Sequence, residues 1–261
     1  MENRELIAIE AAEFEYLQFR VRSLLDIAGN PFGAKTENEG RVNSFSVEAS
    51  ASPMLNRIYG DLVSSADEVS ALIVRYKKLL ALPVVGLLRK TQKTILVDGQ
   101  SLDLLKGWTH VQLGCGIDQV KVSTSSFLVE EVTHETLDLF LKLHAEGFCT
   151  NLSDRNVNKS IFSALLMEGR ARLYLIKVEG RAAAGSVLWL ASNGVGYLGT
   201  AVTAKPFRGI GCHQALISHR ITKAREYGCN YIAATALPTS KSRKNLEKQG
   251  LMMSHWQSLY R

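Results

Sequence analysis

The chain has 261 residues, 46% of them hydrophobic and 21% charged, a composition that is normal for a globular protein with a hydrophobic core. No run of eighteen apolar residues occurs, which argues against a transmembrane helix. The segment from Met1 to Glu5 lacks the basic start of a signal peptide, so we expect a cytoplasmic protein without membrane contacts.

The four cysteines follow no familiar metal-binding or disulfide pattern. They are Cys115, Cys149, Cys212 and Cys229. No two of them are separated by two residues, as in common zinc motifs, so we expect no metal site. A disulfide scaffold is not expected in a chain of this length without a secretion signal. We therefore expect four reduced thiols.

The net charge of +6 is concentrated near the end of the chain. Ten basic and two acidic residues from position 201 onward give that segment a charge of +8. A positive field of this kind suits a polyanionic small molecule or a nucleic acid, and it is also typical of a solvated basic surface. Because aromatic residues are not interleaved with the bases, we expect no nucleic acid partner.

Helical spacing dominates the start of the chain. Apolar residues recur every three or four positions over 2–27, which predicts a helix that the segment Gly29-Asn30-Pro31 ends. Residues 31–53 are rich in Gly, Asn, Ser and Glu, and predict a loop containing one strand, 42–47. Further elements are expected in the first half: a helix over 66–80, a strand over 83–88, a short helix over 102–106 and a strand over 109–113.

The pattern is clearer after position 126. A strand over 127–132 and helices over 135–146 and 157–167 precede a meander of three strands. These strands are expected at 173–178, 184–191 and 195–203, with turns at Glu179-Gly180 and Asn193-Gly194. The chain then predicts a helix over 213–227, a strand over 231–235, a helix over 240–249 and a strand over 251–259.

A glycine-rich turn, Arg208-Gly209-Ile210-Gly211-Cys212-His213, connects the third meander strand to the following helix. The first N–H groups of a helix are unpaired and carry a partial positive charge, so they bind phosphate. Glycines at 209 and 211 remove side chains that would hold a phosphate away, and Arg208 adds positive charge. This segment therefore predicts a pyrophosphate site that needs no metal.

The same six residues resemble the cofactor loop of the GCN5-related N-acetyltransferase (GNAT) superfamily. Its members carry Arg or Gln, two residues, Gly, one residue, and then Gly or Ala, between a strand and a helix. Five of the six positions comply, and His213 departs from the small residue that the family prefers. The resemblance covers residues 127–261. It implies an α/β (α+β) fold with a mixed, mostly antiparallel central sheet flanked by helices, and acetyl-CoA as the co-substrate.

The resemblance also implies which residues touch the cofactor. In the family, the strand before the loop splays from its neighbour, so the main chain of Ala201, Val202 and Thr203 would pair with the pantetheine arm. A main-chain N–H there would polarise the thioester carbonyl. Ser242 and Asn245 resemble a variant found in two-halved members and would also contact the cofactor; alternatively, they form the polar face of a capped helix start. The loop would hold the pyrophosphate with Arg208, Gly209, Ile210, Gly211, Cys212 and His213.

The sequence identifies no catalytic residue. Many GNAT proteins carry Tyr-Glu-Lys, one residue and Gly-Phe, and the tyrosine protonates the departing thiolate; here Leu246 stands at its position. The strand 195–203 has no acid that would serve as a base, and its Tyr197 is interpreted as a core or cleft-lining residue. Glu146 and Asp154 are interpreted as surface acids.

We expect two domains, a degenerate GNAT-like or accessory domain over 1–124 and an acetyltransferase domain over 125–261. The order helix, strand, short helix and strand occurs at 66–114 and again at 213–260, although the residues themselves do not repeat. The first half contains no glycine loop, so we expect it to complete the sheet or to wall the substrate cleft.

A second glycine segment, Leu113 to Asp118, resembles the glycine motif of S-adenosylmethionine-dependent methyltransferases. Those enzymes need an acidic strand before the glycines and a helix after them. Here Gln112 precedes the glycines and 120–122 predicts a strand, so we interpret the segment as a turn.

The sequence as a whole predicts an enzyme that transfers an acetyl group from acetyl-CoA to a primary amine of a small molecule or peptide. Two alternatives stay open. One is a catalytically silent acyl-CoA-binding or regulatory protein, which Leu246 and His213 favour, and the other is a methyltransferase. Neither the acceptor nor the oligomeric state is indicated by the residues.

Overall fold

The computed structural model describes residues 3–39, 42–60, 72, 85–87, 94–97, 100–103 and 106–260. Contacts divide the chain into two compact units, one formed by 1–16 and 111–255 and the other by 17–110 and 256–261. Three elements contribute residues to both units: α1 (Asn3–Leu25), β7 (Lys106–Gly116) and β14 (Met252–Tyr260). These units are discontinuous in sequence, whereas the domains expected at 1–124 and 125–261 are continuous, and that domain assignment stays a prediction.

The first unit is built on a mixed sheet in the order β14-β7-β13-β11-β10-β9-β8, with β12 paired to β10. Neighbouring strands from β8 to β11 are antiparallel, and so are β13 and β7. Among the strand pairs described in this unit, β11 and β13 alone are parallel. The bounds of these strands are β8 (Val129–Glu131), β9 (Ala171–Val178), β10 (Arg181–Leu190), β11 (Val195–Tyr197), β12 (Ala201–Thr203) and β13 (Tyr231–Ala236). The mixed, mostly antiparallel sheet expected from the sequence is confirmed.

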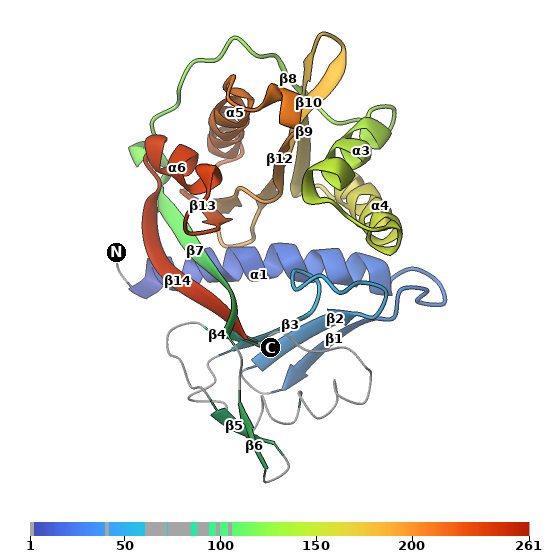
Figure 1. The fold of residues 1–261 in the computed structure, drawn as a ribbon. Coiled ribbons are helices and arrows are strands. Elements are labelled where there is room, and N and C mark those ends of the chain that lie inside the picture. The colour runs from blue at the N-terminus through green and yellow to red at the C-terminus, as the bar shows by residue number, and fades with distance from the viewer. Residues whose placement is uncertain are drawn as a thin grey trace. The chain divides into compact units, whose positions relative to one another are not determined.

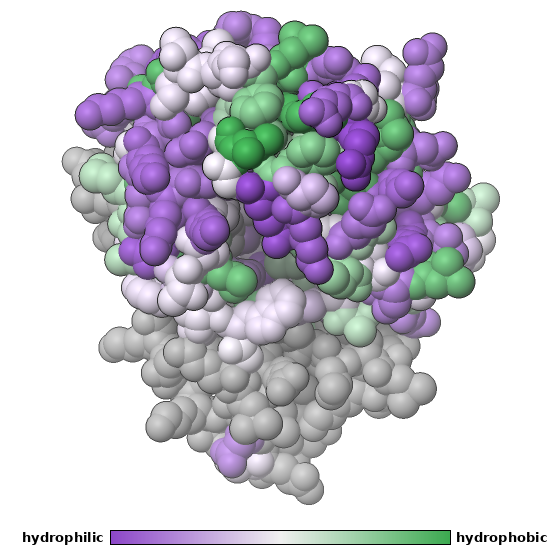
Figure 2. Space-filling model, turned by 45° about the horizontal axis from the view of Figure 1, so that its top comes forward, coloured by the Kyte–Doolittle hydropathy of each residue, from purple (hydrophilic) through white to green (hydrophobic). Residues whose placement is uncertain are grey.

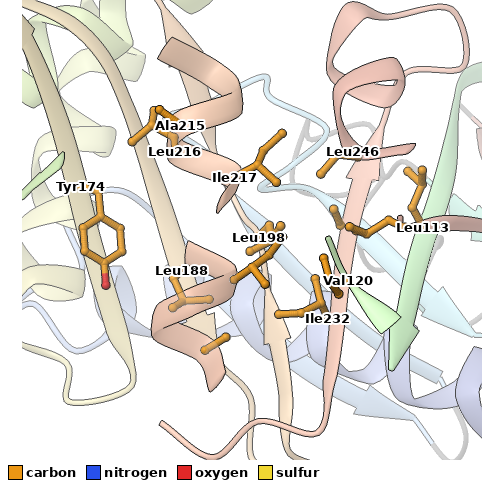
Figure 3. Close-up of a cluster of buried hydrophobic side chains, with 14 of the residues drawn as sticks. Leu113, Val120, Tyr174, Leu188, Leu198, Ala215, Leu216, Ile217, Ile232 and Leu246 are labelled. Atoms are coloured by element: carbon orange, nitrogen blue, oxygen red, sulfur yellow. The ribbon is translucent and has the colours of Figure 1, made fainter. Parts of the chain in front are cut away.

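Helices cover both faces of this sheet (Figure 1). On one face, α5 (Cys212–Glu226) and α6 (Lys241–Lys248) bury an aliphatic cluster against the strands, and Figure 3 shows Ile217, Leu246 and Ile232 in it. On the other face, α3 (Leu137–Phe148) and α4 (Leu152–Met167) meet through an edge-to-face contact of Phe140 and Phe162, whose ring centroids are 5.1 Å apart. Burial of these apolar faces drives the layered arrangement.

Among its described residues, the second unit contains part of α1 and a run of four short neighbouring strands. Its strands β1 (Ala34–Glu39), β2 (Val42–Val47), β3 (Arg57–Gly60) and β4 (Val85–Leu87) lie in the order β1-β2-β3-β4, and β14 pairs with β4. The hairpin β5 (Thr94–Val97) and β6 (Gln100–Asp103) forms a separate two-stranded sheet. The buried residues of this unit include Leu17, Leu24, Phe45 and Ile58.

Several expectations for the first half were wrong. Residues 34–39 form strand β1, which pairs with β2 in the register Ala34↔Val47, because ladder pairing overrides a polar composition. Of the short helix expected over 102–106, residues 102–103 end β6 and residue 106 begins β7, while 104–105 lie outside the described residues. Residues 120–122 are not a strand but part of an irregular segment. The helix expected over 66–80 lies outside the described residues except for Leu72, and the strand expected over 83–88 is described only as β4.

The glycines of the segment Leu113 to Asp118 do not form a turn, which is a further correction. Gly114 and Gly116 lie within strand β7. A Cβ atom at Gly114 would lie 2.7 Å from the Tyr231 ring and 2.9 Å from the Ile232 carbonyl oxygen, so a close approach of β7 and β13 requires this glycine. No phosphate-binding loop is formed there.

The elements expected after position 126 are confirmed in type and order, apart from the strand expected over 195–203, which is broken into β11 and β12. The largest change is at α4, which begins at Leu152 rather than 157 because Asn151 caps it, its side chain accepting a hydrogen bond from the Asp154 N–H at 2.8 Å. The turn at Glu179-Gly180 has positive φ at both residues, as a type I′ hairpin requires. None of the helices in the described ranges is long and apolar enough to cross a membrane.

Candidate functional site

The strand expected over 195–203 is broken in the middle, and this break shapes the site. β11 runs parallel to β13, and the last bond between them is from the Leu198 N–H to the Ala233 carbonyl, at 2.8 Å. β12 then pairs with β10 alone. The register shifts from Trp189↔Tyr197 to Ser186↔Ala201, so residues 198–200 contain one extra residue, a β-bulge. After Leu198 the backbone therefore diverges from β13, and β12 and β13 are not paired. We call the separation between β12 and β13 the fork.

The edge of β12 that faces the fork carries main-chain groups that do not bond to β10. Bonds from the Val187 N–H to the Thr200 carbonyl and from the Ala204 N–H to the Ala183 carbonyl, both 2.9 Å, set the alternation of the ladder. In an antiparallel pair every second residue points toward the partner strand. Val202 therefore bonds to β10, while the N–H and C=O groups of Ala201 and Thr203 point toward the fork.

A buried arginine holds the bulge. Arg220 on α5 is 1% exposed, and its guanidinium donates to the carbonyl oxygens of Gly199 at 2.9 Å, Val187 at 3.0 Å and Leu216 at 3.1 Å. Burial lowers the pKa of this guanidinium to about 9, which leaves it protonated at neutral pH. Sequence reasoning missed Arg220, although a base among the inward apolar residues of a helix, beside Ile217 and Ile221, is the signal that reveals it.

The glycine segment forms the strand-to-helix turn that the sequence predicted. Gly209 and Gly211 have φ angles of +88° and +104°, a region that side chains disfavour. The first bond of α5 runs from the Ala215 N–H to the Gly211 carbonyl, at 3.0 Å. The N–H groups of Cys212, His213 and Gln214 therefore have no acceptor within the helix. A Cβ at Gly209 would meet open space, so this turn is accessible to a ligand.

Arg208 and Cys212 contribute differently to the loop. Arg208 is exposed, and its Nε donates to the Thr203 carbonyl oxygen at 3.1 Å, which confirms that this carbonyl points away from β10. Cys212 is 1% exposed, and burial raises the pKa of its thiol. The thiol packs into the core under the loop, so only the main chain of Cys212 faces the turn.

His213 and Asn245, two residues that the sequence assigns to the cofactor, contact each other. The Asn245 Nδ2 lies 3.0 Å from the His213 Nδ1, which joins the first turn of α5 to α6. Burial, and to a lesser extent the charge of Arg220, lowers the pKa of His213 to about 4. The imidazole is therefore neutral at pH 7.

The remaining positions on α6 are a capped helix start and a core residue. Ser240 is the N-cap, and its hydroxyl accepts from the Arg243 N–H at 3.1 Å. Ser242 lies in the first turn and is partly exposed. Leu246 is 3% exposed and points into the aliphatic cluster of Figure 3. The position that holds a tyrosine in many GNAT proteins thus serves packing in this chain.

A pocket of about 250 Å³ lies beside the glycine loop. One wall is the first half of α5, where Ser218 accepts a hydrogen bond from the Ser123 N–H at 3.2 Å. Figure 2 shows one face of the molecule, on which hydrophilic residues surround smaller hydrophobic patches. The lining residues of the pocket are Ser123, Thr124, Ser125, Ser126, Phe127, Ile210, Gly211, Gln214, Ala215 and Ser218.

A second functional candidate that sequence reasoning missed is Glu13 on α1. Its side chain is fully buried against the strands at the fork, where the Thr235 hydroxyl donates to it at 3.1 Å. Glu13 lies four residues from Ile9 and from Leu17 on the inward apolar face of the helix, and an acid at such a position is the signal that reveals it. Within the described ranges, no group of three or more metal-ligating side chains comes together.

Comparison with solved structures identifies the fold. A GCN5-related N-acetyltransferase from Kribbella flavida superimposes with a TM-score of 0.63 at 11% identity, covering 96% of this chain and 94% of that one. A conserved protein of unknown function from Staphylococcus epidermidis gives 0.61 at 10% identity, with coverages of 88% and 94%. A GCN5-related N-acetyltransferase from Sphaerobacter thermophilus gives 0.55 at 11% identity, with coverages of 84% and 79%.

The chain therefore has the fold of GCN5-related N-acetyltransferases over most of its length. No protein-family model matches the sequence, and no curated protein matches it. At these identities the likeness establishes the fold alone, and the chemistry has to be argued from the residues of this chain.

Proposed function

We propose that this protein transfers an acetyl group from acetyl-CoA to a primary amine of a small molecule or a peptide. The observation that carries the proposal is the fork between β12 and β13, where the main-chain groups of Ala201 and Thr203 point away from β10 and lead to the glycine loop. Strand edge, positive-φ glycines and unpaired helix N–H groups follow one another within thirteen residues, from 201 to 213. That succession suits an extended thioester arm that ends in a pyrophosphate.

The residues present fit acetyl-CoA. The N–H and C=O groups of Ala201 and the N–H of Thr203 would pair with the amides of the pantetheine arm, as an added strand pairs with a sheet edge, while the Thr203 C=O is bound by Arg208. Val202 would not contact the arm through its main chain, since its N–H and C=O bond to β10. Gly209 to His213 would hold the pyrophosphate with main-chain N–H groups, Arg208 would add charge, and Ser242 and Asn245 would lie at the border of α6.

The expected chemistry is direct transfer. A neutral amine attacks the thioester carbonyl, whose oxygen is stabilised by a main-chain N–H at the fork, and the C–S bond breaks. Leu246 cannot protonate the thiolate, so solvent or the attacking nitrogen supplies that proton. Holding the amine against the thioester contributes most of the rate, because orientation alone is worth several kcal/mol. Cytoplasmic location stays a prediction.

The proposal is tested by calorimetric titration with acetyl-CoA, CoA and S-adenosylmethionine. The variant Gly211→Trp should lower affinity for both CoA compounds at least about 100-fold, because an indole at the helix start fills the phosphate position. Gly228→Trp is the matched control, since Gly228 also has positive φ, +77°, and lies at the opposite end of α5. Equal affinity of the two variants would remove the glycine loop from the proposal.

An alternative function is a catalytically silent acyl-CoA-binding protein, which the packed Leu246 favours. Release of free thiol from acetyl-CoA in the presence of a panel of amines separates the two. Binding without thiol release would support the silent protein. The methyltransferase alternative loses its basis, because Gly114 and Gly116 lie in a strand rather than in a loop.

A further inference from the structure

A buried polar cluster lies on the α1 side of the fork. Glu13 is 0% exposed, and its carboxylate accepts from the Gln112 Nε2 at 2.7 Å and from the Thr235 hydroxyl at 3.1 Å. The Tyr197 hydroxyl lies 3.5 Å from the same carboxylate and donates to the Thr235 oxygen at 3.0 Å. Three strands, β7, β11 and β13, thus present polar side chains to one acid of α1.

The cluster spans both arms of the fork. Tyr16, one turn after Glu13 on α1, shares a hydrogen bond of 2.9 Å with the Thr200 hydroxyl in the bulge. Thr235 stands on the opposite arm, in β13. Both threonines are partly exposed, whereas Glu13, Tyr16 and Tyr197 are buried. Thr200 and Thr235 are therefore the members of the cluster that are accessible from outside.

Thr235 is suited to pass a proton. Its single hydroxyl proton has two acceptors within reach, Glu13 Oε1 at 3.1 Å and Gln112 Oε1 at 2.8 Å. Its oxygen retains a lone pair for a donor on the open side. The main-chain N–H and C=O of Thr235 also face the fork. The Ala233 carbonyl points to that side, since it accepts from the Leu198 N–H, and main-chain groups two residues apart in a strand point the same way.

We propose that Glu13 accepts, through the Thr235 hydroxyl, the proton that the acceptor ammonium loses before it attacks acetyl-CoA. This inference rests on the proposed function. One ammonium N–H proton passes to the Thr235 oxygen while the Thr235 proton passes to Glu13. The neutral amine then forms the C–N bond, the C–S bond breaks with its electron pair on sulfur, and the second nitrogen proton neutralises the thiolate. Glu13 later returns its proton to solvent.

The cluster also selects the class of acceptor. A carboxylate behind a neutral hydroxyl favours a cationic nitrogen that carries a proton to give away, such as a primary ammonium. A hydroxyl acceptor would bring no charge to attract. The described contacts of Glu13 include the titratable hydroxyl of Tyr197 on β11, together with Gln112 on β7 and Thr235 on β13. The ring of Tyr16 lies beside that of Tyr197, with centroids 5.7 Å apart.

The test uses the full chain and compares Glu13→Gln with Glu15→Gln. The control residue is on the same helix and binds Ser192 and Arg170 at the surface. With an amine for which thiol release is measured, Glu13→Gln should lower kcat at pH 7 about 100-fold, a usual contribution of a general base. The KM for acetyl-CoA should stay unchanged. The deficit should shrink about tenfold per pH unit as solution deprotonates more of the amine.

A second pair of variants keeps the test decisive if Glu13→Gln does not fold. Thr235→Val removes the hydroxyl at equal volume, and Thr235→Ser retains it. Loss of kcat in the valine variant with recovery in the serine variant supports the relay. A deficit that is equal at every pH, or wild-type rates in Glu13→Gln, overturns it. If the wild type itself releases no thiol with any amine, the proposed function fails as well, so the two failures are distinguishable.

Discussion

Two charged side chains are buried at the same fork, one on each face of the sheet, and they differ in what they touch. Arg220 on the α5 face is 1% exposed and binds three main-chain carbonyls. Glu13 on the α1 face is 0% exposed and binds the side chains of Gln112 and Thr235. A charge held by main-chain groups fixes the path of the strand, whereas a charge that binds a hydroxyl has a proton within reach to exchange.

The largest effect is expected when Arg220 is replaced. Arg220→Met leaves the carbonyls of Gly199 and Val187 buried without donors, and should lower the free energy of unfolding by about 3 kcal/mol. Urea unfolding measures the change. Lys223→Met, one turn away in a surface ion pair with Glu226, should change it far less, because solvent screens an exposed pair. Equal costs for the two variants would show that Arg220 does not hold the bulge.

The neutral imidazole of His213 allows a test based on the pH dependence of stability. The folded-state pKa of His213 is about 4, below the ordinary value of 6.5, because the ring is buried. The unfolded chain therefore binds this proton first as the pH falls. The contribution of His213 to stability is complete above pH 6.5 and is lost between pH 6.5 and 4, by about 3 kcal/mol.

The measurement is the free energy of unfolding of the wild type and His213→Ala at pH 7 and pH 4.5. The variant should lose less stability than the wild type over this interval, by about 2 kcal/mol. His134→Ala, at an exposed position, is the control and should follow the wild type. Parallel curves for all three proteins would mean that His213 titrates normally in the folded state.

The smallest expected effect is on the Glu13 side. Tyr16→Phe removes the hydrogen bond to Thr200, whose hydroxyl is partly exposed and can bind water instead. The free energy of unfolding should fall by about 1 kcal/mol or less. Turnover should fall far less than in Glu13→Gln, since Tyr16 is not on the path from Thr235. An equal loss of kcat would place the proton path on the Thr200 arm.

Much of the site could be predicted because its signals are local. Gly209 and Gly211 mark a turn with positive φ, and the helix that follows is recognisable from its own periodicity, so the loop and α5 are found where they were expected. The sequence assigns His213 and Asn245 to the cofactor, but it does not reveal the hydrogen bond between them, since they are 32 residues apart. Local patterns predict elements, and they carry no information on which distant side chains meet.

The sequence by itself determined the order of elements after position 126, the glycine loop and the absence of the tyrosine at Leu246. Tertiary structure decided the rest. The break at 198–200 depends on Arg220 reaching two carbonyls of the sheet and on Gly199, where a Cβ would lie 3.0 Å from the Tyr16 ring. Glu13 and Thr235 are 222 residues apart and meet only because α1 packs over the fork. Burial and partners, which no single segment encodes, determine what a charged side chain does.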